Sequence, residues 1–536
     1  MKKITLLFTA IIFSVNGFSQ APVIQWQNNI GGSSADNLYC IRQTADGGYI
    51  LGGFSSSNIS GDKTENCFGW DDYWIVKTDA SGNIQWQNTI GGNDIDRVLS
   101  VQQTTDGGYI LGGYSYSVIS GDKTENNIGV SDYWIVKTDA SGNIQWQNTM
   151  GGTGFDELQC IQQTADGGYI LGGYSNSNSS TDKTENCMGG FDYWIVKTNA
   201  SGNIQWQNTI GGNNDDLLRT VQQTIDGGYI LGGYSSSNIS VDKTENSIGN
   251  YDYWIVKTDS LGNIQWQNTI GGSSGDDFFS IEQTVDGGYI LGGYSRSNTS
   301  GDKSENNWDT TLVTGDYWIV KTDASGNIQW QNTIGGSDED WLRYIQQTTD
   351  GGYILCGDSW SNSSGDKTEN LVGGLYSDYW IIKINASGNI QWQNTIGGNL
   401  YEDYSSIEQT TEGGYILGGR SESSISGDKT ENSIGWFDYW IIKLAPDFPT
   451  VSDEKVAAKE SLLLFPSPAT TEVTINFGNT SYFNVQLRNT LGEVLQQTQT
   501  TSATLSLNIS SYPKGIYFVT VSDENKNSVT GKVVKM

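Results

Sequence analysis

The sequence predicts an all-β protein: a seven-bladed β-propeller followed by a small C-terminal β-sandwich. Three observations lead to this fold class. One set of motifs repeats seven times, each repeat contains four short strand-like segments, and the repeats begin and end at points that let the first strand complete the last repeat. The composition, with 68 glycines and 6 prolines, suits many short strands joined by tight turns.

Three landmarks define the repeat. Ile-Gln-Trp-Gln-Asn, Asp-Tyr-Trp and Gly-Gly-Tyr-Ile each occur seven times, at steps of 60 to 64 residues. The first landmark contributes Trp26, Trp86, Trp146, Trp206, Trp266, Trp330 and Trp392. The second contributes Trp74, Trp134, Trp194, Trp254, Trp318, Trp380 and Trp440. We expect these 14 of the 19 tryptophans to lie in the core.

The four segments of the first repeat are Leu38–Thr44, Tyr49–Ser55, Tyr73–Thr78 and Asn83–Thr89. Asp-Gly-Gly follows the first segment and Asp-Ala-Ser-Gly-Asn follows the third, and both sequences are typical of tight hairpin turns. Four strands per repeat of this length describe a propeller blade, whereas a β-solenoid uses repeats of roughly 20–30 residues.

Ring closure is predicted from the ends of the repeat region, residues 21–444. The chain starts with an unmatched fourth strand, Ile24–Asn28, and leaves the last repeat after a third strand, Tyr439–Leu444. The first strand can therefore complete the seventh blade and remove the open edges of a linear array. In this topology the links Gly91–Asp96 and Ser55–Asp72, and their counterparts in other repeats, share one face, which we call the long-loop face.

The composition excludes several classes of function. The chain carries 60 acidic and 29 basic residues, a formal net charge of −31, and no histidine. So acidic a surface repels nucleic acid, which proteins bind mainly through lysine and arginine, so we expect no nucleic-acid partner. The absence of histidine removes the commonest general base and zinc ligand. We expect no cofactor, with calcium on oxygen ligands as the one metal left open.

The first 19 residues predict a secretory signal peptide. Met1-Lys2-Lys3 is basic, Ile4–Val15 is a short apolar run, and Gly17 and Ser19 are small residues near the cleavage point. The apolar run is too short to span a bilayer and no later stretch approaches the roughly 20 residues required, so we expect no transmembrane segment. The predicted location is outside the cell, either released or on the outer-membrane surface.

The C-terminal region breaks the repeat pattern. A polar linker, residues 445–461, precedes residues 462–536, whose alternation predicts strands at Thr471–Phe477, Phe483–Arg488, Thr504–Ile509 and Ile516–Val521. The motifs of this region are Phe-Pro-Ser-Pro-Ala at Phe465–Ala469, the Gly492-Glu493 turn, Gly-Ile-Tyr-Phe at Gly515–Phe518 and the basic end Lys532–Lys535.

These motifs resemble the type A C-terminal sorting domain of the type IX secretion system of Bacteroidetes. The usual opening of that domain is Tyr-Pro-Asn-Pro, from which Phe465 and Ser467 depart. The resemblance implies export across the outer membrane, with residues 462–536 as the part that the secretion machinery recognises. The repeats are also similar to the Asp-Gly-Gly-Tyr-Ile propeller repeats of exported Bacteroidetes proteins, a group with no shared activity.

Acidic residues recur on the long-loop face. Every repeat carries Asp-Lys-Thr-Glu-Asn, or Asp-Lys-Ser-Glu-Asn in the fifth, and an acid ten residues after each Ile-Gln-Trp. In the first repeat these acids are Asp62, Glu65 and Asp36, which are candidate calcium ligands. The alternative is a structural loop in which Asp and Asn bind backbone N–H groups, and occurrence in all seven repeats favours it.

Two pairs of cysteines occupy matching positions in repeats 1 and 3. Because the cell exterior is oxidising, we predict the disulfides Cys40–Cys67 and Cys160–Cys187. The alternative is that one repeat was copied from the other. Cys356 replaces a strand glycine and is predicted to be a buried free thiol.

Five tryptophans lie outside the landmarks, in or beside the long loops: Trp70, Trp308, Trp341, Trp360 and Trp436. They belong to repeats 1, 5, 6 and 7, which become neighbours when the ring closes, and repeats 5 and 6 also carry loop insertions. Exposed aromatic rings beside carboxylates such as Asp340 and Glu402 are typical of sugar-binding sites. We therefore predict a ligand site over this arc of the long-loop face. The alternative is that these rings pack the loops onto the rim.

Three functions remain open at this point. The first is a secreted or surface propeller that acts as a binding or adhesion module, with carbohydrate as the expected ligand. The second is a carbohydrate-active enzyme that uses carboxylates of the long-loop face, although no pair stands out from the sevenfold background and we name no catalytic residue. The third is a structural surface protein without a small ligand.

Overall fold

The computed structural model describes residues 20–309, 313–447, 463–465, 469–476, 483–489, 494–502, 504–523 and 528–535. The chain divides into two compact units, Met1–Pro449 and Thr450–Met536. All regular elements in these ranges are β-strands, and none of the described residues forms a helix that could cross a membrane. The predicted signal peptide and most of the predicted linker lie outside the described residues.

The first unit contains seven four-stranded antiparallel sheets, the blades. The innermost strands are β2 (Asp36–Gln43), β6 (Asp96–Gln103), β10 (Asp156–Gln163), β14 (Asp216–Gln223), β18 (Asp276–Gln283), β22 (Asp340–Gln347) and β26 (Glu402–Gln409). The second strands are β3 (Tyr49–Ser55), β7 (Tyr109–Ser115), β11 (Tyr169–Ser175), β15 (Tyr229–Ser235), β19 (Tyr289–Ser295), β23 (Tyr353–Ser359) and β27 (Tyr415–Ser421).

The third strands are β4 (Asp72–Thr78), β8 (Asp132–Thr138), β12 (Asp192–Thr198), β16 (Asp252–Thr258), β20 (Asp316–Thr322), β24 (Asp378–Ile384) and β28 (Asp438–Leu444). The outermost strands are β5 (Ile84–Ile90), β9 (Ile144–Met150), β13 (Ile204–Ile210), β17 (Ile264–Ile270), β21 (Ile328–Ile334), β25 (Ile390–Ile396) and β1 (Ile24–Ile30). The predicted strands of the first repeat differ from the observed ones by at most two residues at each end.

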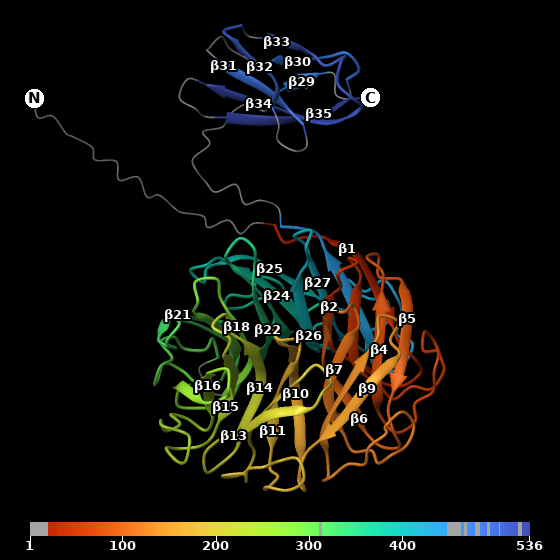
Figure 1. The fold of residues 1–536 in the computed structure, drawn as a ribbon. Helices are drawn as coiled ribbons and strands as arrows, with labels where there is room; N and C mark the ends of the chain where they lie inside the picture. Colours follow the sequence, from red (N-terminus) through yellow and green to blue (C-terminus); the bar gives the residue numbers. More distant parts are fainter. Residues whose placement is uncertain are drawn as a thin grey trace, which may run out of the picture. The chain divides into compact units, whose positions relative to one another are not determined.

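Blade 7 confirms the predicted closure of the ring. Its strand order is β26-β27-β28-β1, so the N-terminal strand supplies the missing outermost strand (Figure 1). The pairing of β1 with β28 is antiparallel and sets Ile30 opposite Tyr439. Tyr439 Oη donates to Trp74 O of blade 1 at 3.0 Å, and Tyr73 Oη donates in the same way to Trp134 O of blade 2. The junction between blades 7 and 1 therefore has the same tyrosine-to-backbone hydrogen bond as the junction between blades 1 and 2.

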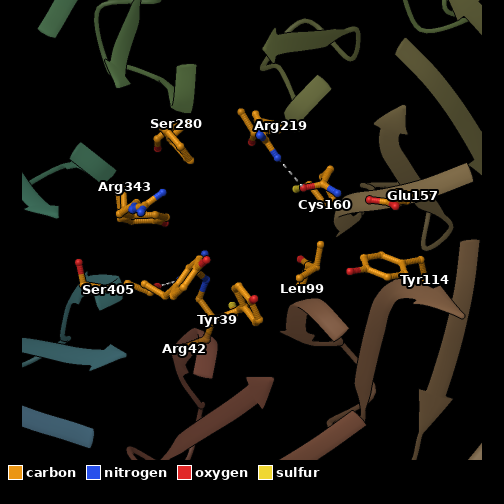
Figure 2. Close-up of a pocket in the computed structure, with 18 of the residues that line it drawn as sticks. Tyr39, Arg42, Leu99, Tyr114, Glu157, Cys160, Arg219, Ser280, Arg343 and Ser405 are labelled. Carbon is orange, nitrogen blue, oxygen red and sulfur yellow. Dashed lines mark hydrogen bonds between the residues drawn. The ribbon is translucent and has the colours of Figure 1, made fainter. Parts of the chain in front are cut away.

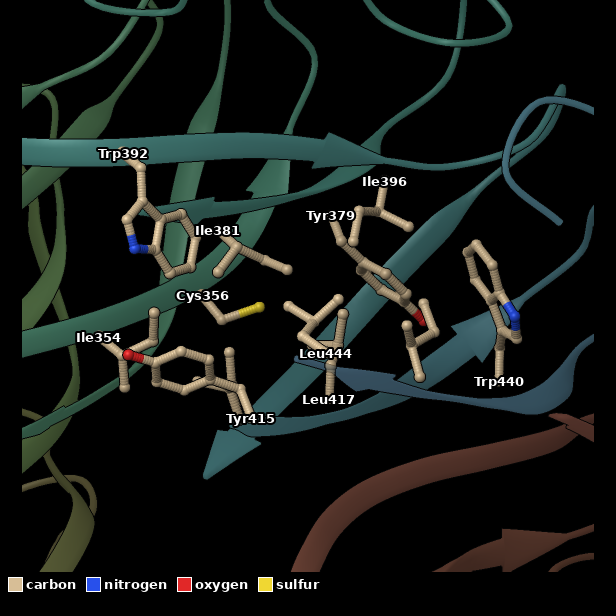
Figure 3. Close-up of a cluster of buried hydrophobic side chains, with 12 residues drawn as sticks. Ile354, Cys356, Tyr379, Ile381, Trp392, Ile396, Tyr415, Leu417, Trp440 and Leu444 are labelled. Atoms are coloured by element: carbon tan, nitrogen blue, oxygen red, sulfur yellow. The ribbon is translucent and has the colours of Figure 1, made fainter. Parts of the chain in front are cut away.

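The third strands supply the core between blades. All seven Asp-Tyr-Trp tryptophans are fully buried, because both faces of these strands are covered. Figure 3 shows the cluster shared by blades 6 and 7, where Cys356 packs among Ile381, Tyr379 and Leu417. Cys356 is a buried free thiol, as predicted.

The Ile-Gln-Trp tryptophans correct the prediction that all fourteen repeat tryptophans are core residues. Trp392 is buried, but the other six are only partly buried. They lie on the outermost strands and pack against the core clusters of the blades while staying partly exposed. Their rings cover the turns of neighbouring blades, as Trp86 does at Gly142, where an added Cβ would lie 2.7 Å from the indole.

The second unit is a small sandwich of two sheets, ordered β29-β30-β33 and β32-β31-β34-β35. Its strands are β29 (Leu463–Phe465), β30 (Glu472–Asn476), β31 (Phe483–Arg488), β32 (Val494–Thr500), β33 (Thr504–Asn508), β34 (Gly515–Asp523) and β35 (Ser528–Lys535). Val473, Leu487 and Val519 form part of its core. All four predicted strands are present, whereas residues 466–468 and the Gly492-Glu493 turn lie outside the described residues.

Candidate functional site

The candidate site is built on the innermost strands, whose side chains line the axis of the propeller. In blade 1 the register of β2 against β3 shifts between Leu38 and Cys40, which marks a β-bulge. A bulge re-aims side chains along a strand, and here Tyr39 and Cys40 both line the central cavity. The same shift recurs in blades 2 to 6. Each of these blades thus presents two consecutive residues to the axis.

The innermost strands are also where the blades differ most. The third strand reads DYWIVKT in five blades, and the outermost strand reads IQWQNTI in five. By contrast, the seven innermost strands read DNLYCIRQ, DRVLSVQQ, DELQCIQQ, DLLRTVQQ, DDFFSIEQ, DWLRYIQQ and EDYSSIEQ. Buried positions in these strands keep the same type of side chain in most blades, whereas positions that face the axis change from blade to blade.

Two adjoining cavities occupy the axis. The upper cavity, of about 450 Å³, lies toward the long-loop face and is lined by the bulge residues of the innermost strands and by the second-strand tyrosines Tyr114 and Tyr174. Figure 2 shows Tyr39, Arg219 and Arg343 around this cavity, each from a different blade. The lower cavity, of about 420 Å³, lies toward the short turns. Both volumes are in the range of small-ligand sites.

Aromatic rings and guanidinium groups alternate along one side of the upper cavity. Phe279 lies between two arginines, with the Arg219 guanidinium 5.6 Å and the Arg343 guanidinium 4.9 Å from its ring centre. Arg343 also lies 5.2 Å from the ring of Tyr404, which meets Tyr39 edge-on at 5.2 Å. These contacts hold the guanidinium planes against the wall. They run through blades 4, 5, 6, 7 and 1.

Tyr404 departs from the pattern of the other blades. Its counterparts, such as Leu38 and Leu342, are buried core residues. In blade 7 the register is lost between Asp403 and Ser406, and Tyr404 has a φ of 57°, which is uncommon for a residue other than glycine. The ring therefore lines the cavity, where the Arg420 guanidinium covers it at 4.3 Å. Backbone conformations of this kind concentrate at functional sites.

Charges within the upper cavity are partly compensated. Arg343 Nε donates to Asp358 Oδ2 at 2.8 Å. Asp358 is fully buried, and this ion pair compensates the charge of Arg343. Burial raises the pKa of Asp358, and Arg343 opposes that rise. Glu157 accepts a hydrogen bond from Tyr174 Oη at 2.6 Å and is the one carboxylate among the described lining residues.

The structure separates the five tryptophans predicted to bind ligand. Trp341 stacks on Tyr294 at 5.3 Å, contacts Trp360 at 4.9 Å, and lies 5.0 Å from the guanidinium of Arg343, which lines the upper cavity. Neither indole is among the described lining residues. Trp70 and Trp436 are the most exposed of the five, each 76% exposed.

Trp308 packs on the neighbouring blade. Its ring lies over Gly365, where an added Cβ would lie 2.7 Å from it, and its Nε1 donates to Asp366 at 2.8 Å. In blades 1 and 7, Phe68 and Ile434 lie in the same way over Gly121 and Gly61. Trp308 therefore fills an apolar position that recurs between blades.

Burial removes Asp340 and Glu402 from the predicted ligand site. Both side chains are fully buried, and each accepts a backbone N–H, from Gly336 at 2.7 Å and from Gly398 at 2.8 Å. The acid ten residues after Ile-Gln-Trp therefore stabilises the link between blades. This corrects the prediction that these two carboxylates contact a ligand.

The three predicted calcium ligands serve separate backbone groups. Asp36 accepts from Gly32 N at 2.6 Å, Asp62 from Gly31 N at 3.2 Å, and Glu65 from Thr89 N at 2.6 Å. Among the described residues no three acids or cysteines gather where they could hold a metal ion. The geometry supports the structural alternative for the Asp-Lys-Thr-Glu-Asn loop, and calcium binding stays a prediction without a site.

The predicted disulfides are wrong, since all five cysteines are free. Cys40 pairs with Gly52 in the ladder and faces the axis, whereas Cys67 Sγ lies 2.9 Å from Ser55 O, three residues farther along β3. Three strand residues span about 10 Å, well beyond the reach of a disulfide. Cys187 makes the same contact with Ser175 O at 2.8 Å, and Ser247 Oγ takes that role in blade 4. In blades 2 and 5 the matching carbonyl accepts from Asn127 and Asn307 Nδ2, whereas blade 6 has Leu371 at this position.

The cavity residues were missed by sequence reasoning, although a signal was present. The long loops and the innermost strands both vary between repeats, and the structure brings the variable residues of the innermost strands together at the axis. Arg219, Phe279 and Arg343 all fall on one bulge position, where no two of blades 1 to 6 except blades 4 and 6 share a residue. Their convergence could not be read without the bulge and the closed ring.

Comparison with known proteins assigns the C-terminal unit. Residues 463–536 match the family model described as "Secretion system C-terminal sorting domain". This region is a type IX secretion sorting domain. The protein is accordingly secreted or displayed at the cell surface, and the sorting domain is its link to the type IX machinery.

The chain is also similar to a curated protein and to several solved structures, at low sequence identity. Regulatory protein FlaEY of Caulobacter vibrioides is 21% identical over 378 residues, which cover 65% of this chain and 39% of FlaEY. PorZ, a surface component of the type-IX secretion system of Porphyromonas gingivalis, is 10% identical, with a TM-score of 0.42 over 94% of this chain and 60% of PorZ. The Pan2 WD40 domain of Neurospora crassa is 9% identical, with a TM-score of 0.38 over 78% of this chain and 95% of that domain.

Proposed function

We propose that this exported propeller is a binding or adhesion module that takes a saccharide in the upper cavity. The observation that carries the proposal is the blade-to-blade variation of the residues facing the axis, within a repeat that is otherwise nearly uniform. Stability alone would favour seven equivalent strands, because each blade makes the same contacts. Residues that break the symmetry at one place are best explained by an asymmetric ligand.

The lining suits a sugar. Tyr39, Phe279, Tyr344 and Tyr404 offer aromatic faces and edges to a pyranose ring, and Trp341 with Trp360 extends this surface toward the long loops. Ser280 and Gln159 provide groups that can donate to or accept from hydroxyls. Glycoside hydrolysis uses two carboxylates near the scissile bond, whereas the described lining of the upper cavity holds only Glu157, so binding is favoured over catalysis.

The test is a glycan array followed by calorimetric titration of the purified protein with the best-bound saccharide. We expect Tyr404→Ala to weaken binding by about 1–3 kcal/mol, as for a central aromatic anchor. Trp70→Ala is the matched control, since Trp70 is exposed and absent from the described cavity lining. Weaker binding by the Trp70→Ala variant alone would move the site to the outer loops. Failure to bind any saccharide would favour the structural surface role.

A further inference from the structure

The repeat region contains six arginines, and only two of them have no carboxylate within ion-pair distance in the described structure. Four are ion-paired: Arg97 with Asp71, Arg296 with Glu339, Arg343 with Asp358 and Arg420 with Asp403. The remaining two, Arg42 and Arg219, both line the upper cavity. In a chain with a net charge of −31, carboxylates outnumber cations, so the pairing of two arginines with neutral groups is notable.

The lysines of the repeats do not offer alternative cations. Those of the Asp-Lys-Thr-Glu-Asn loops are buried, as with Lys123 on Thr149 Oγ1 at 2.6 Å. Those of the third strands are buried and ion-paired to the short turns, as with Lys77 on Asp46 at 3.0 Å. An anion that reaches the axis therefore meets arginine.

Arg219 is held by neutral partners. Its Nη1 donates to Gln159 Oε1 at 3.2 Å and its Nη2 lies 3.4 Å from Tyr234 Oη, while its buried Nε has no partner in the described structure. The rings of Tyr234 and Phe279 flank the guanidinium at 5.4 and 5.6 Å. A buried donor without a partner costs about 1–3 kcal/mol, and an unpaired buried charge costs more. A carboxylate in the cavity would supply the missing negative charge and accept paired N–H···O bonds from the two Nη groups.

Arg42 adds positive charge at the floor of the upper cavity, where it borders both cavities. It donates to Ile41 O at 2.8 Å and lies 5.1 Å from the ring of Tyr344. Glu408 and Glu282 are the acidic side chains of the lower cavity that interact electrostatically with Arg42. Burial raises the pKa of Glu282 to about 7, so Glu282 is incompletely ionised at neutral pH and neutralises Arg42 only in part. Burial also raises the pKa of Glu408.

We propose that the saccharide bound in the upper cavity is acidic, and that its carboxylate binds Arg219 while its ring lies against the neighbouring aromatic side chains. This inference rests on the proposed function and names its ligand class: sugars that bear a carboxylate, such as uronic or sialic acids. Arg42 acts as a second, deeper positive group. The net negative charge of the protein opposes the approach of any anion, so recognition depends on these local guanidinium groups.

The experiment is a glycan array on the purified protein in which each uronic- or sialic-acid saccharide is paired with its carboxyl-reduced form, followed by titration of the best acidic binder. We expect binding to an acidic member and at least a tenfold loss with its carboxyl-reduced partner. Arg219→Gln should weaken binding at least tenfold without lowering Tm, because glutamine removes an unpaired charge. Arg219→Lys should fall between the two, since it keeps the charge and loses the bidentate geometry. Arg97→Gln, which changes an ion-paired arginine absent from the described cavity lining, should leave affinity unchanged.

Each remaining outcome has a defined meaning. Equal binding of acidic and carboxyl-reduced saccharides, or of wild type and Arg219→Gln, overturns the acidic-ligand inference. If only neutral saccharides bind and Tyr404→Ala abolishes that binding, the proposed function stands and this inference is wrong. If no saccharide of either kind binds, the proposed function fails as well. A sulfated saccharide that binds as well as the carboxylated one shows that the site selects negative charge rather than the carboxylate, and overturns the assignment to uronic or sialic acids.

Discussion

The innermost strand of each blade and the three strands outside it follow different rules. The outer three are nearly identical around the ring, because each must cover the same faces of its neighbours: Trp134 and Trp194 lie in the same buried environment in consecutive blades. The innermost strand packs through residues on either side of its bulge, such as Val98 and Val101, and presents the two between them to the axis. Repetition therefore marks the residues that stabilise the fold, and variation marks the residues available for binding. The following predictions test this division.

The largest effect is expected from removing β1. A mature chain that begins at residue 31 lacks the outermost strand of blade 7, which exposes the edge of β28 and uncovers the cluster containing Ile30, Ile416 and Tyr439. Exposed edges template pairing with other chains. We expect aggregation and loss of the cooperative thermal transition, measured by light scattering and calorimetry. A chain that begins at residue 23 keeps β1 and should behave as wild type. A monomeric, cooperatively folding chain from residue 31 would contradict the closed ring.

The next effect contrasts two tryptophans of one blade. Trp134→Ala removes a fully buried indole that donates to Gln147 at 3.1 Å, and should lower the free energy of unfolding by about 3–5 kcal/mol. Trp146→Ala removes a partly buried ring on the outermost strand, and should cost about 1–2 kcal/mol. Chemical denaturation of both variants measures the difference. Equal losses would mean that the two landmark tryptophans contribute alike, contrary to their burial.

Stability should depend on pH through buried acids that meet where blades join. Burial, and then the proximity of Asp340, raises the pKa of Asp316 to about 8, and burial raises that of Asp340 to about 6. Asp72 and Asp96, in the same relation, have pKa values raised to about 7 and about 6. Unfolded aspartate ionises near pH 3.9. The folded state therefore binds more protons between about pH 4 and 8, and stability is lost as pH rises through that window.

We expect a Tm several degrees higher at pH 5 than at pH 8 in thermal melts at constant ionic strength. Asp316→Asn removes one titrating group and should flatten the profile. Asp338→Asn changes an exposed acid of the adjoining loop and should not. An increase in Tm from pH 5 to pH 8 would show that the pKa values of these aspartates are not raised in the folded protein.

The smallest effect concerns a backbone position in the long loops. Five blades have a glycine there with φ between 54° and 58°: Gly61, Gly121, Gly301, Gly365 and Gly427. Val241 occupies this position in blade 4 with a φ of 45°. A valine in the left-handed region is strained, so Val241→Gly should raise stability by about 0.5–1 kcal/mol after the entropy cost of glycine. Val118→Gly, at an exposed loop position without a positive φ, should lower it. A loss in both variants would mean that the strain at Val241 is negligible.

The form of the blade could be predicted from local sequence patterns. Asp-Gly-Gly turns, the runs Tyr49–Ser55 and Tyr73–Thr78, and the unmatched strand at Ile24 depend on backbone conformation and alternation within a few residues, and these local rules predicted strand positions, blade number and closure. The sorting domain was equally readable, since its motifs are contiguous. Local rules could not say which side of a strand the polar residues would face. Asp340 and Glu402 were therefore assigned to a ligand site, although both are buried at the junctions between blades.

The location of the site depends on contacts between distant parts of the chain. Arg219, Phe279 and Arg343 are each about 60 residues apart in sequence, and nothing near any one of them indicates the others. They meet because a bulge turns each side chain toward the axis and because the ring closes on the pairing of Ile30 with Tyr439. The same closure sets Cys40 on the axis and leaves Cys67 near Ser55. Contacts made around an axis depend on the direction of every blade at once, and so lie beyond any pattern local to one repeat.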